Sequence, residues 1–314
     1  MMNIKDFANE VAAMATGYTA EVRDIVKNND NMLTGITFRK GDDSICPTVY
    51  VNSYFKKYCD GIMSLDEAAH DIEKVAEDAF SNTPFSLDAD GIGDIVMNYS
   101  NAKKLIHSRL VNTGKNKKLL EELPHISLAD LSIIFSIDLT ENNDGISSIK
   151  VNDSILSKWG VDAEELLKVA NENTTWQIKT MHETLMEIVR EKGDFEMLSL
   201  LEATADEEGT MFVASNITKI NGAAILADNN ELERFSKAHG EESFYILPSS
   251  VHECLFLPVN ENEVPDVTTL ENMVREVNST QVAPEDVLSD NVYFYDAEKK
   301  SVYRAFGDRE EAVI

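Results

Sequence analysis

Residues 33–61 read LTGITFRKGDDSICPTVYVNSYFKKYCDG, and this stretch carries the pattern that decides the fold. It begins with a run typical of a strand, passes through Gly-Asp-Asp turn residues at 41–43 and reaches a second strand-like run at 48–51. Asn52 can then cap a short amphipathic helix, and Gly61 can end it. The stretch therefore predicts a hairpin whose second strand leads directly into a helix.

The same order returns twice further along the chain. Residues 131–160 read LSIIFSIDLTENNDGISSIKVNDSILSKWG, and residues 211–240 read MFVASNITKINGAAILADNNELERFSKAHG. In the third copy Asn221 and Gly222 provide the turn, which makes the apolar run after them the second strand. Recurring hairpin-then-helix units predict an α+β fold, in which amphipathic helices cover antiparallel sheets and no doubly wound parallel sheet is present.

The other elements follow from apolar spacing and caps. Helical spacing predicts helices within 3–28, 64–80, 94–122, 176–203 and 267–279, the second opening with a Ser64–Glu67 capping box. Strand pairs are expected within 245–259 and 291–306. We expect a weak domain boundary near Leu123, so that residues 1–123 hold the first unit and residues 124–314 hold the others; a single domain is the alternative.

Composition narrows the class of protein. Of 314 residues, 43% are apolar and 27% charged, which is typical of a globular chain. There are 56 acidic and 28 basic residues, for a net charge of −28. Such a surface repels phosphate backbones and anionic lipids, so we expect no general nucleic-acid or membrane binding. Mimicry of a nucleic acid towards a basic protein is an alternative, but a soluble acidic surface explains the charge more simply.

The N-terminal stretch and the cysteines indicate a compartment. Residues 1–24 carry early charges and no uninterrupted apolar core, unlike a signal peptide. The three cysteines are Cys46, Cys59 and Cys254, and they form no CxxC pair. This sparse, odd set suits a reducing environment, so the sequence predicts a cytoplasmic protein.

Several stretches together resemble one known family. They are LTGITFRKGDDSICPTVYV, LSIIFSIDL, ILSKWGVDAEELLKVANENT, NGAAILADN, YILPSSVHECLFLP and NSTQVAPEDVLSDNVYFYDAEKK. The chain is similar over nearly its whole length to the domain-of-unknown-function family numbered 5688. The resemblance implies a free-standing soluble protein of about this length, and it implies no reaction, cofactor or catalytic residue.

One polar cluster is a candidate for catalysis. Residues 245–259 read YILPSSVHECLFLPV, with Ser249, Ser250, His252 and Glu253 between apolar runs. In an extended segment Ser250 and His252 share a face, so a hydrolase using Ser249 or Ser250 with His252 as base is one hypothesis. Glu253 would face the other way, and no Gly-x-Ser-x-Gly motif surrounds either serine. We favour a turn in which the hydroxyls bind backbone amides.

A basic segment runs against the overall charge. Residues 95–120 contain no acidic side chain; they contain His107 and the cations Lys103, Lys104, Arg109, Lys115, Lys117 and Lys118. These six cations are candidates for docking an acidic partner or a phosphorylated ligand. The alternative, which we favour, is a solvated surface whose cations pair with acidic neighbours of the same fold.

The sequence contains no recognisable metal-binding or cofactor-binding motif. MHETL at 181–185 lacks the second histidine of a zinc helix, because residue 186 is methionine. Phosphate-binding and dinucleotide-binding glycine motifs are missing as well. We therefore predict no metal and no cofactor. The leading hypothesis is a non-catalytic binding or regulatory protein that acts on a protein or small ligand, with the hydrolase and the nucleic-acid mimic as alternatives.

Overall fold

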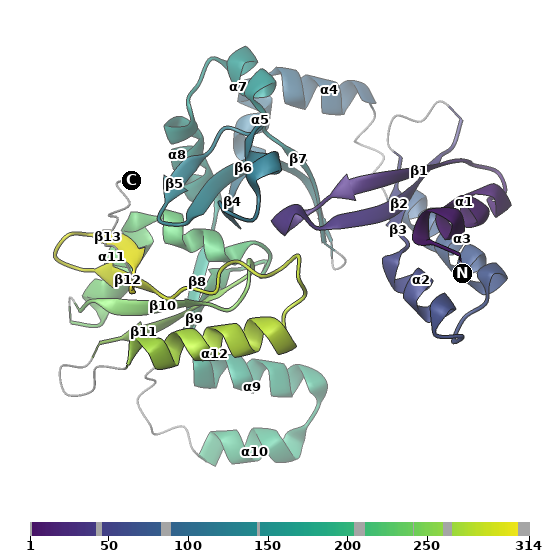
Figure 1. The fold of residues 1–314 in the computed structure, drawn as a ribbon. Coiled ribbons are helices and arrows are strands. Elements are labelled where there is room, and N and C mark those ends of the chain that lie inside the picture. Colours follow the sequence, from purple (N-terminus) through teal and green to yellow (C-terminus); the bar gives the residue numbers. More distant parts are fainter. Residues whose placement is uncertain are drawn as a thin grey trace. The chain divides into compact units, whose positions relative to one another are not determined.

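The structure is a computed structural model that describes residues 2–41, 46–82, 89–142, 145–203, 211–240, 242–259 and 266–306. Its tertiary contacts form two compact units, Met1–Asn101 and Ala102–Ile314 (Figure 1). All strand pairs within the described ranges are antiparallel, and helices pack on the sheets. The predicted α+β class is confirmed.

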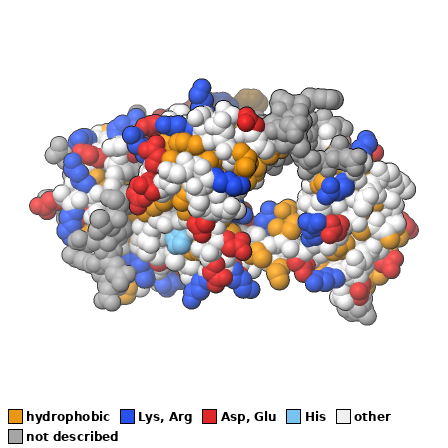
Figure 2. Space-filling model, turned by 90° about the horizontal axis from the view of Figure 1, so that it is seen from above, with side chains coloured by type: hydrophobic (Ala, Val, Ile, Leu, Met, Phe, Trp, Pro, Cys, Tyr) orange, Lys and Arg blue, Asp and Glu red, His pale blue; other side chains and the backbone are white. Residues whose placement is uncertain are grey.

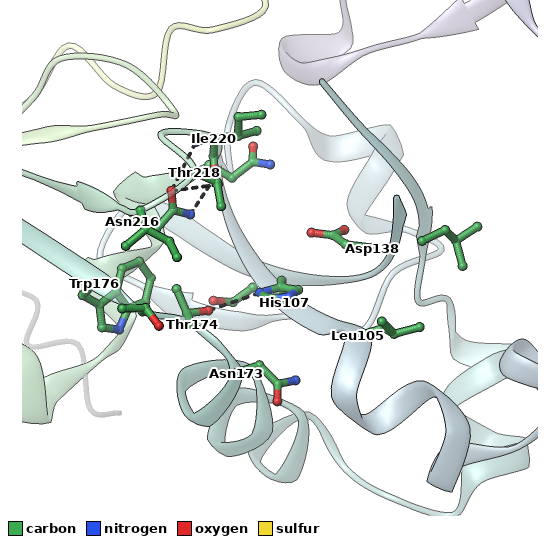
Figure 3. Close-up of a pocket in the computed structure, with 14 residues that line it drawn as sticks. Leu105, His107, Asp138, Asn173, Thr174, Trp176, Asn216, Thr218 and Ile220 are labelled. Atoms are coloured by element: carbon green, nitrogen blue, oxygen red, sulfur yellow. Dashed lines mark hydrogen bonds between the residues drawn. The ribbon is translucent and has the colours of Figure 1, made fainter. Parts of the chain in front are cut away.

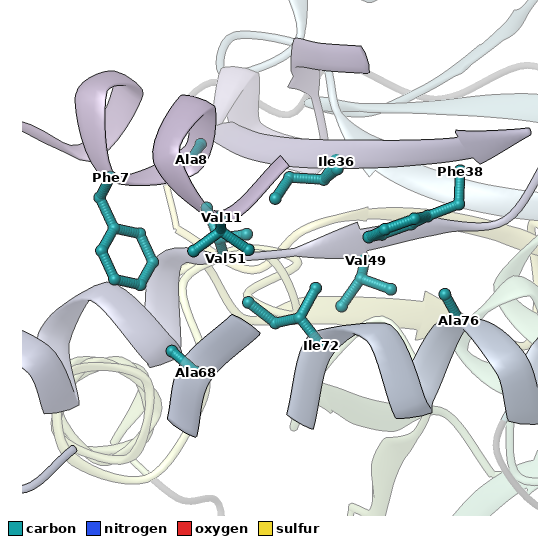
Figure 4. Packing of buried hydrophobic residues seen from close by; sticks show 10 residues of the cluster. All are labelled: Phe7, Ala8, Val11, Ile36, Phe38, Val49, Val51, Ala68, Ile72 and Ala76. Carbon is teal, nitrogen blue, oxygen red and sulfur yellow. The ribbon is translucent and has the colours of Figure 1, made fainter. Parts of the chain in front are cut away.

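The first unit is built on a three-stranded sheet in the order β1-β2-β3. Its elements are α1 (Ile4–Met14), β1 (Thr19–Val26), η1 (Asn28–Asp30), β2 (Met32–Arg39), β3 (Thr48–Tyr50), α2 (Asn52–Cys59), α3 (Leu65–Asn82) and α4 (Ala89–Met97), with α5 (Tyr99–Ala102) at the junction. Phe7 and Val11 of α1, Ile36 and Phe38 of β2 and Ile72 of α3 meet in one buried cluster (Figure 4). This cluster gives the first unit its own core.

The β2–β3 hairpin and α2 of the first unit are present, and Asp42 and Asp43 of the predicted turn lie outside the described residues. Asn52 does not cap α2, because its Oδ1 accepts the Thr34 amide at 3.0 Å. The predicted entry helix is too long: α1 ends at Met14, where Ala15 is extended, and residues 19–26 form β1, which pairs with β2 from Thr19↔Arg39 to Val26↔Met32.

The predicted capping box is confirmed: the Ser64 amide donates to Glu67 Oε2 at 2.8 Å, and the Glu67 amide donates to Ser64 Oγ at 3.2 Å. The Ser64 amide and the Ser64 hydroxyl both donate to the Glu67 carboxylate, and these two bonds lower the pKa of Glu67.

The second unit contains two antiparallel sheets. In the four-stranded sheet, β6 (Leu131–Asn142) pairs with β4 (Ile106–Asn112) on one edge and with β5 (Ile126–Leu128) and β7 (Gly145–Lys150) on the other. The six-stranded sheet has the order β13-β12-β10-β11-β9-β8. Its strands are β8 (Trp176–Thr180), β9 (Phe212–Asn216), β10 (Phe244–Pro248), β11 (Cys254–Pro258), β12 (Tyr293–Asp296) and β13 (Ser301–Arg304). Both strand pairs predicted near the C-terminus are therefore confirmed.

Helices of this unit lie between and beside the two sheets (Figure 1). They are η2 (Lys103–Leu105), α6 (Lys117–Leu120), α7 (Asp153–Trp159), α8 (Ala163–Asn173), α9 (Met181–Lys192), α10 (Phe195–Ala203), η3 (Gly222–Ala227), α11 (Asn229–Ala238) and α12 (Val267–Thr280). The expected helix over 267–279 is confirmed as α12. None of the described helices is long and apolar enough to cross a bilayer.

Two of the predicted helical stretches contain strands. Residues 106–112 form β4, paired in register with β6 from Ile106↔Ile137 to Asn112↔Leu131, and 176–180 form β8. Because β4 and β6 pair across residues 113–130, both sides of the expected boundary near Leu123 belong to one sheet. The division between the compact units lies upstream, between Asn101 and Ala102.

The second hairpin-then-helix unit follows the sequence pattern, and the third does not. Asn152 Oδ1 caps α7 by accepting the Ile155 amide at 2.9 Å, and Gly160 ends the helix with a φ of 68°. In the third, residues 222–227 form η3, a fully buried 3-10 helix, where a second strand was predicted. A Cβ at Gly222 would lie 2.1 Å from Ser215 Oγ, so this close approach requires glycine. The small side chains that follow fit a tight buried turn better than a sheet.

A half-buried carboxylate ties distant segments of the second unit together. Asp130, just before β6, accepts hydrogen bonds from Asn112 at 3.3 Å, from Ser289 at 3.3 Å, and from Asn291 and Tyr293 at 2.8 Å each. Tyr293 is fully buried, and burial together with the Asp130 charge raises its pKa well above the ordinary value. The Asp130 carboxylate thus joins the first sheet of the unit to β12.

A second polar contact fastens α11 to the β12–β13 turn. The exposed carboxylate of Glu233 lies 2.6 Å from Lys237 Nζ and 2.8 Å from Lys300 Nζ. These hydrogen bonds lower the pKa of Glu233 from an ordinary value of 4.5 to about 2.

Candidate functional site

A cavity of about 280 Å³ lies within the second unit, where the β4 edge approaches the ends of β8 and β9 (Figure 3). Four separate segments line it: Leu105, His107 and Ser108 of η2 and β4, residues 138–139 of β6, residues 173–176 where α8 leads into β8, and residues 216–218, 220 and 221 where β9 leads into η3. Leucine, isoleucine and tryptophan side chains alternate with amides, hydroxyls, a histidine and a carboxylate. Such a mixture is usual in small-ligand sites.

The His107 ring is oriented by Thr174 (Figure 3). Thr174 Oγ1 donates its proton to the Ala170 carbonyl at 2.8 Å and lies 3.3 Å from His107 Nδ1. Since the hydroxyl has only one proton, His107 Nδ1 donates the hydrogen in this contact. One wall of the cavity is thereby fixed in orientation.

Asp138 stands at an irregular point of β6 and is held by Arg109. The β6–β7 register shifts between Asp138 and Thr140, a bulge-like change of the kind that redirects side chains beside functional sites. Asp138 Oδ1 accepts hydrogen bonds from Ser136 Oγ at 2.8 Å and from the Arg109 guanidinium at 3.0 Å. Arg109 also donates to Ser148 Oγ at 2.8 Å. This candidate from the basic segment is therefore engaged in a half-buried ion pair.

The turn after β9 is held in a strained shape. Lys219 and Asn221 have φ angles of 57° and 56°, in the left-handed region that costs side-chain-bearing residues energy. Asn216 supports the turn, because its Nδ2 donates to the Ile220 carbonyl at 2.8 Å and its Oδ1 accepts the Ile220 amide at 3.2 Å (Figure 3). Strain held in this way is common where a protein preorganises a site.

Ser108 and Trp176 also lie at the cavity wall. Ser108 is only 5% exposed, and no described residue hydrogen-bonds its hydroxyl. Buried hydroxyls usually have a partner, so this one needs an explanation. Trp176 donates from Nε1 to Asp228 Oδ2 at 2.9 Å, which fixes the indole as part of the lining. The Ser108 oxygen is enclosed by protein and does not open into the cavity, whereas Trp176 gives the cavity an anchored aromatic ring.

The polar cluster between β10 and β11 has the geometry of a turn. Ser250 Oγ accepts the backbone amide of His252 at 3.0 Å, and Ser249 Oγ donates to Glu253 Oε1 at 3.2 Å. His252 Nδ1 accepts the Asn221 amide at 3.1 Å, and Nε2 lies 3.4 Å from Asp286 Oδ1. Both ring nitrogens therefore have partners other than a serine hydroxyl, and the structure does not bring a nucleophile–base pair together among these residues.

The candidate cations do not converge on one site. Lys103 lies 3.8 Å from Glu165, and Lys115 lies 3.6 Å from Asp290. Lys104, Lys117 and Lys118 are exposed on η2 and α6. On the face drawn in Figure 2, basic and acidic side chains are interspersed. With Arg109, three of the six cations thus pair with acidic residues of the same unit.

Comparison with known proteins gives one match. A family model described as a family of unknown function, DUF5688, matches residues 3–297. The chain belongs to this family. No curated protein and no solved structure matches the chain. In the described ranges, no three His, Cys, Asp or Glu side chains are grouped so that they could hold a metal ion.

The sequence alone does not reveal most of the cavity. His107 stands out there only as a member of the basic segment, and no motif marks Asp138, Asn173, Trp176 or Asn216. The available signals are polar clusters directly after apolar elements, NENTTW at 171–176 and SNITKIN at 215–221. Each has the local pattern of a cap or turn, and only the fold brings the two together.

Proposed function

We propose that the DUF5688 chain is a binding module whose second unit, Ala102–Ile314, holds a small polar metabolite in the cavity beside β4. The observation that carries this proposal is the cavity itself, whose lining combines the Asp138 carboxylate and the oriented His107 ring with apolar side chains. A volume of about 280 Å³ lies at the small end of ligand pockets, so a metabolite fits better than a cofactor or a peptide.

The lining favours a ligand that donates hydrogen bonds. Asp138 contributes a carboxylate, and no lysine or arginine is among the described lining residues. Arg109 already pairs with that carboxylate, so the described lining residues provide no further cation for an anionic ligand. Leu105, Leu139 and Ile217 provide an apolar surface at the same site. The ligand class that fits is a neutral or cationic small molecule with hydroxyl or amino groups and an apolar part.

The other functions weighed from the sequence have less support. A serine hydrolase requires a base at the hydroxyl, whereas Ser250 accepts an amide and both His252 nitrogens are engaged elsewhere. A nucleic-acid mimic requires carboxylates in rows, whereas both signs of charge mix on the face in Figure 2. Binding in the cavity is consistent with every contact described above.

The test is retention of metabolites by matched variants. The full chain would be dialysed against a cell-extract metabolite fraction, and retained compounds would be identified by mass spectrometry. Ile217→Trp enlarges a 59% exposed side chain in the lining and should abolish retention, while Ile62→Trp enlarges a 72% exposed side chain in the other unit and should leave retention unchanged. Equal retention by both variants, or none by the unaltered chain, would show the proposal to be wrong.

A further inference from the structure

The hairpin formed by α9 and α10 presents an apolar surface that the described residues do not bury. Neither helix contains a buried residue. Phe195 is 77% exposed and Met197 45% exposed on α10, and Leu185 and Ile188 of α9 are 41% and 39% exposed. We call these four side chains the hairpin surface. A helix as apolar all round as FEMLSLLEA at 195–203 is normally covered.

The hairpin is anchored at one side only. Thr180 and Glu183 form a reciprocal capping box at the start of α9, and Lys179 is paired with Glu187. α9 packs on β8 and β9, and α10 packs on α9, on its side away from the sheet (Figure 1). The following residues, 204–210, read TADEEGT and contain no large apolar side chain. The cover of the hairpin surface must therefore come from elsewhere.

The charge of the α9–α10 hairpin indicates which kind of partner would cover the hairpin surface. Residues 181–203 carry six acidic side chains (Glu183, Glu187, Glu191, Asp194, Glu196 and Glu202) and two basic ones (Arg190 and Lys192). A second copy of this chain would bring the same acidic excess against it, whereas a cationic partner would be attracted. Apolar anchors with an acidic surround are the chemistry that receives a basic amphipathic helix. Met181, Met186 and Met197 add side chains that adapt to different partners.

We propose that the α9–α10 hairpin is a docking surface for a basic amphipathic helix of a partner protein. The apolar stripe of that helix packs on the hairpin surface, and its lysines and arginines face the surrounding carboxylates. This site is distinct from the metabolite cavity, because no residue of 181–203 belongs to the cavity lining.

The test uses three fluorescent peptides of about 20 residues, long enough for a stable helix contact. One has a Lys/Leu amphipathic helical pattern, one replaces each lysine by glutamate, and one scrambles the Lys/Leu order. Fluorescence anisotropy with the full chain should show binding of the first peptide at least roughly tenfold tighter than of the others, and weakening with salt. Equal binding of the scrambled peptide, or no binding of the Lys/Leu peptide, would overturn the proposal.

Variants distinguish peptide binding at the hairpin surface from non-specific attraction to the acidic chain. Phe195→Ser with Met197→Ser replaces exposed side chains and should weaken Lys/Leu peptide binding roughly tenfold or more, while Ile62→Ser on the other unit should not. Glu191→Lys with Glu196→Lys should reverse the preference between the Lys and Glu peptides. Ultracentrifugation that shows a dimer abolished by the Phe195 and Met197 changes would identify a second copy as the cover and overturn the proposal.

Discussion

Replacing Ser108 by alanine should stabilise the second unit. The Ser108 side chain is 5% exposed and its hydroxyl has no described partner. An unsatisfied buried hydroxyl costs about 1–3 kcal/mol, and alanine removes the polar atom while keeping the Cβ. Allowing for the lost packing of one oxygen, we expect the free energy of unfolding to rise by about 1 kcal/mol in the absence of ligand.

The assay is urea unfolding followed by tryptophan fluorescence. The only two tryptophans, Trp159 and Trp176, both lie in the second unit, so the signal reports on that unit. The matched control is Ser132→Ala. Ser132 is fully buried on the neighbouring strand β6, and its hydroxyl lies 2.8 Å from that of Thr113. Losing this partner should lower the free energy of unfolding by about 1 kcal/mol. A destabilisation equal to that of Ser132→Ala would refute the reasoning, because it would mean that the Ser108 hydroxyl is already satisfied in the free protein.

Three further predictions concern stability. Asp130→Ala should lower the free energy of unfolding by roughly 2–4 kcal/mol because it leaves the Tyr293 hydroxyl buried and unpaired, and Tyr293→Phe should cost less in the same urea titration. Gly222→Ala should lower the melting temperature strongly, because the new Cβ would lie 2.6 Å from a backbone carbonyl oxygen. Gly114→Ala is the control: its Cβ would meet only a side-chain oxygen at 3.4 Å, so its melting temperature should stay close to that of the unaltered chain. Between pH 4.5 and about 2 the unfolded chain protonates Glu233 before the folded chain does, so stability falls with falling pH; Glu233→Gln should flatten that region of the urea-midpoint profile.

Elements with local signals could be predicted from the sequence. The capping residues Asn152 and Ser64 and the terminating Gly160 act over three or four positions, so their side-chain contacts follow from spacing alone. Hairpins β10–β11 and β12–β13 have apolar, aromatic-rich strands and a short connection, which again is local information. These features locate the α+β fold without any knowledge of distant contacts.

The wrong predictions of secondary structure concern segments whose conformation depends on contacts with distant parts of the chain. Residues 106–112 have an apolar spacing that fits a helix as well as a strand. They form a strand because the long strand β6 provides backbone hydrogen-bonding groups along their whole length. Residues 222–227 turn into a 3-10 helix because Gly222 lies against Ser215 and the His252 carbonyl, two contacts that no local pattern announces. Tertiary contacts override local preference at both places.

The cavity escaped prediction for a related reason, and the reason also explains the histidine of the β10–β11 turn. The polar lining residues have ordinary local roles, since Thr174 binds a helix carbonyl and Asn216 closes a turn. His252 lies outside the lining, but its Nδ1 accepts the amide of Asn221, a residue of the cavity wall in left-handed conformation. We therefore interpret His252 as a support that holds the strained turn against the cavity.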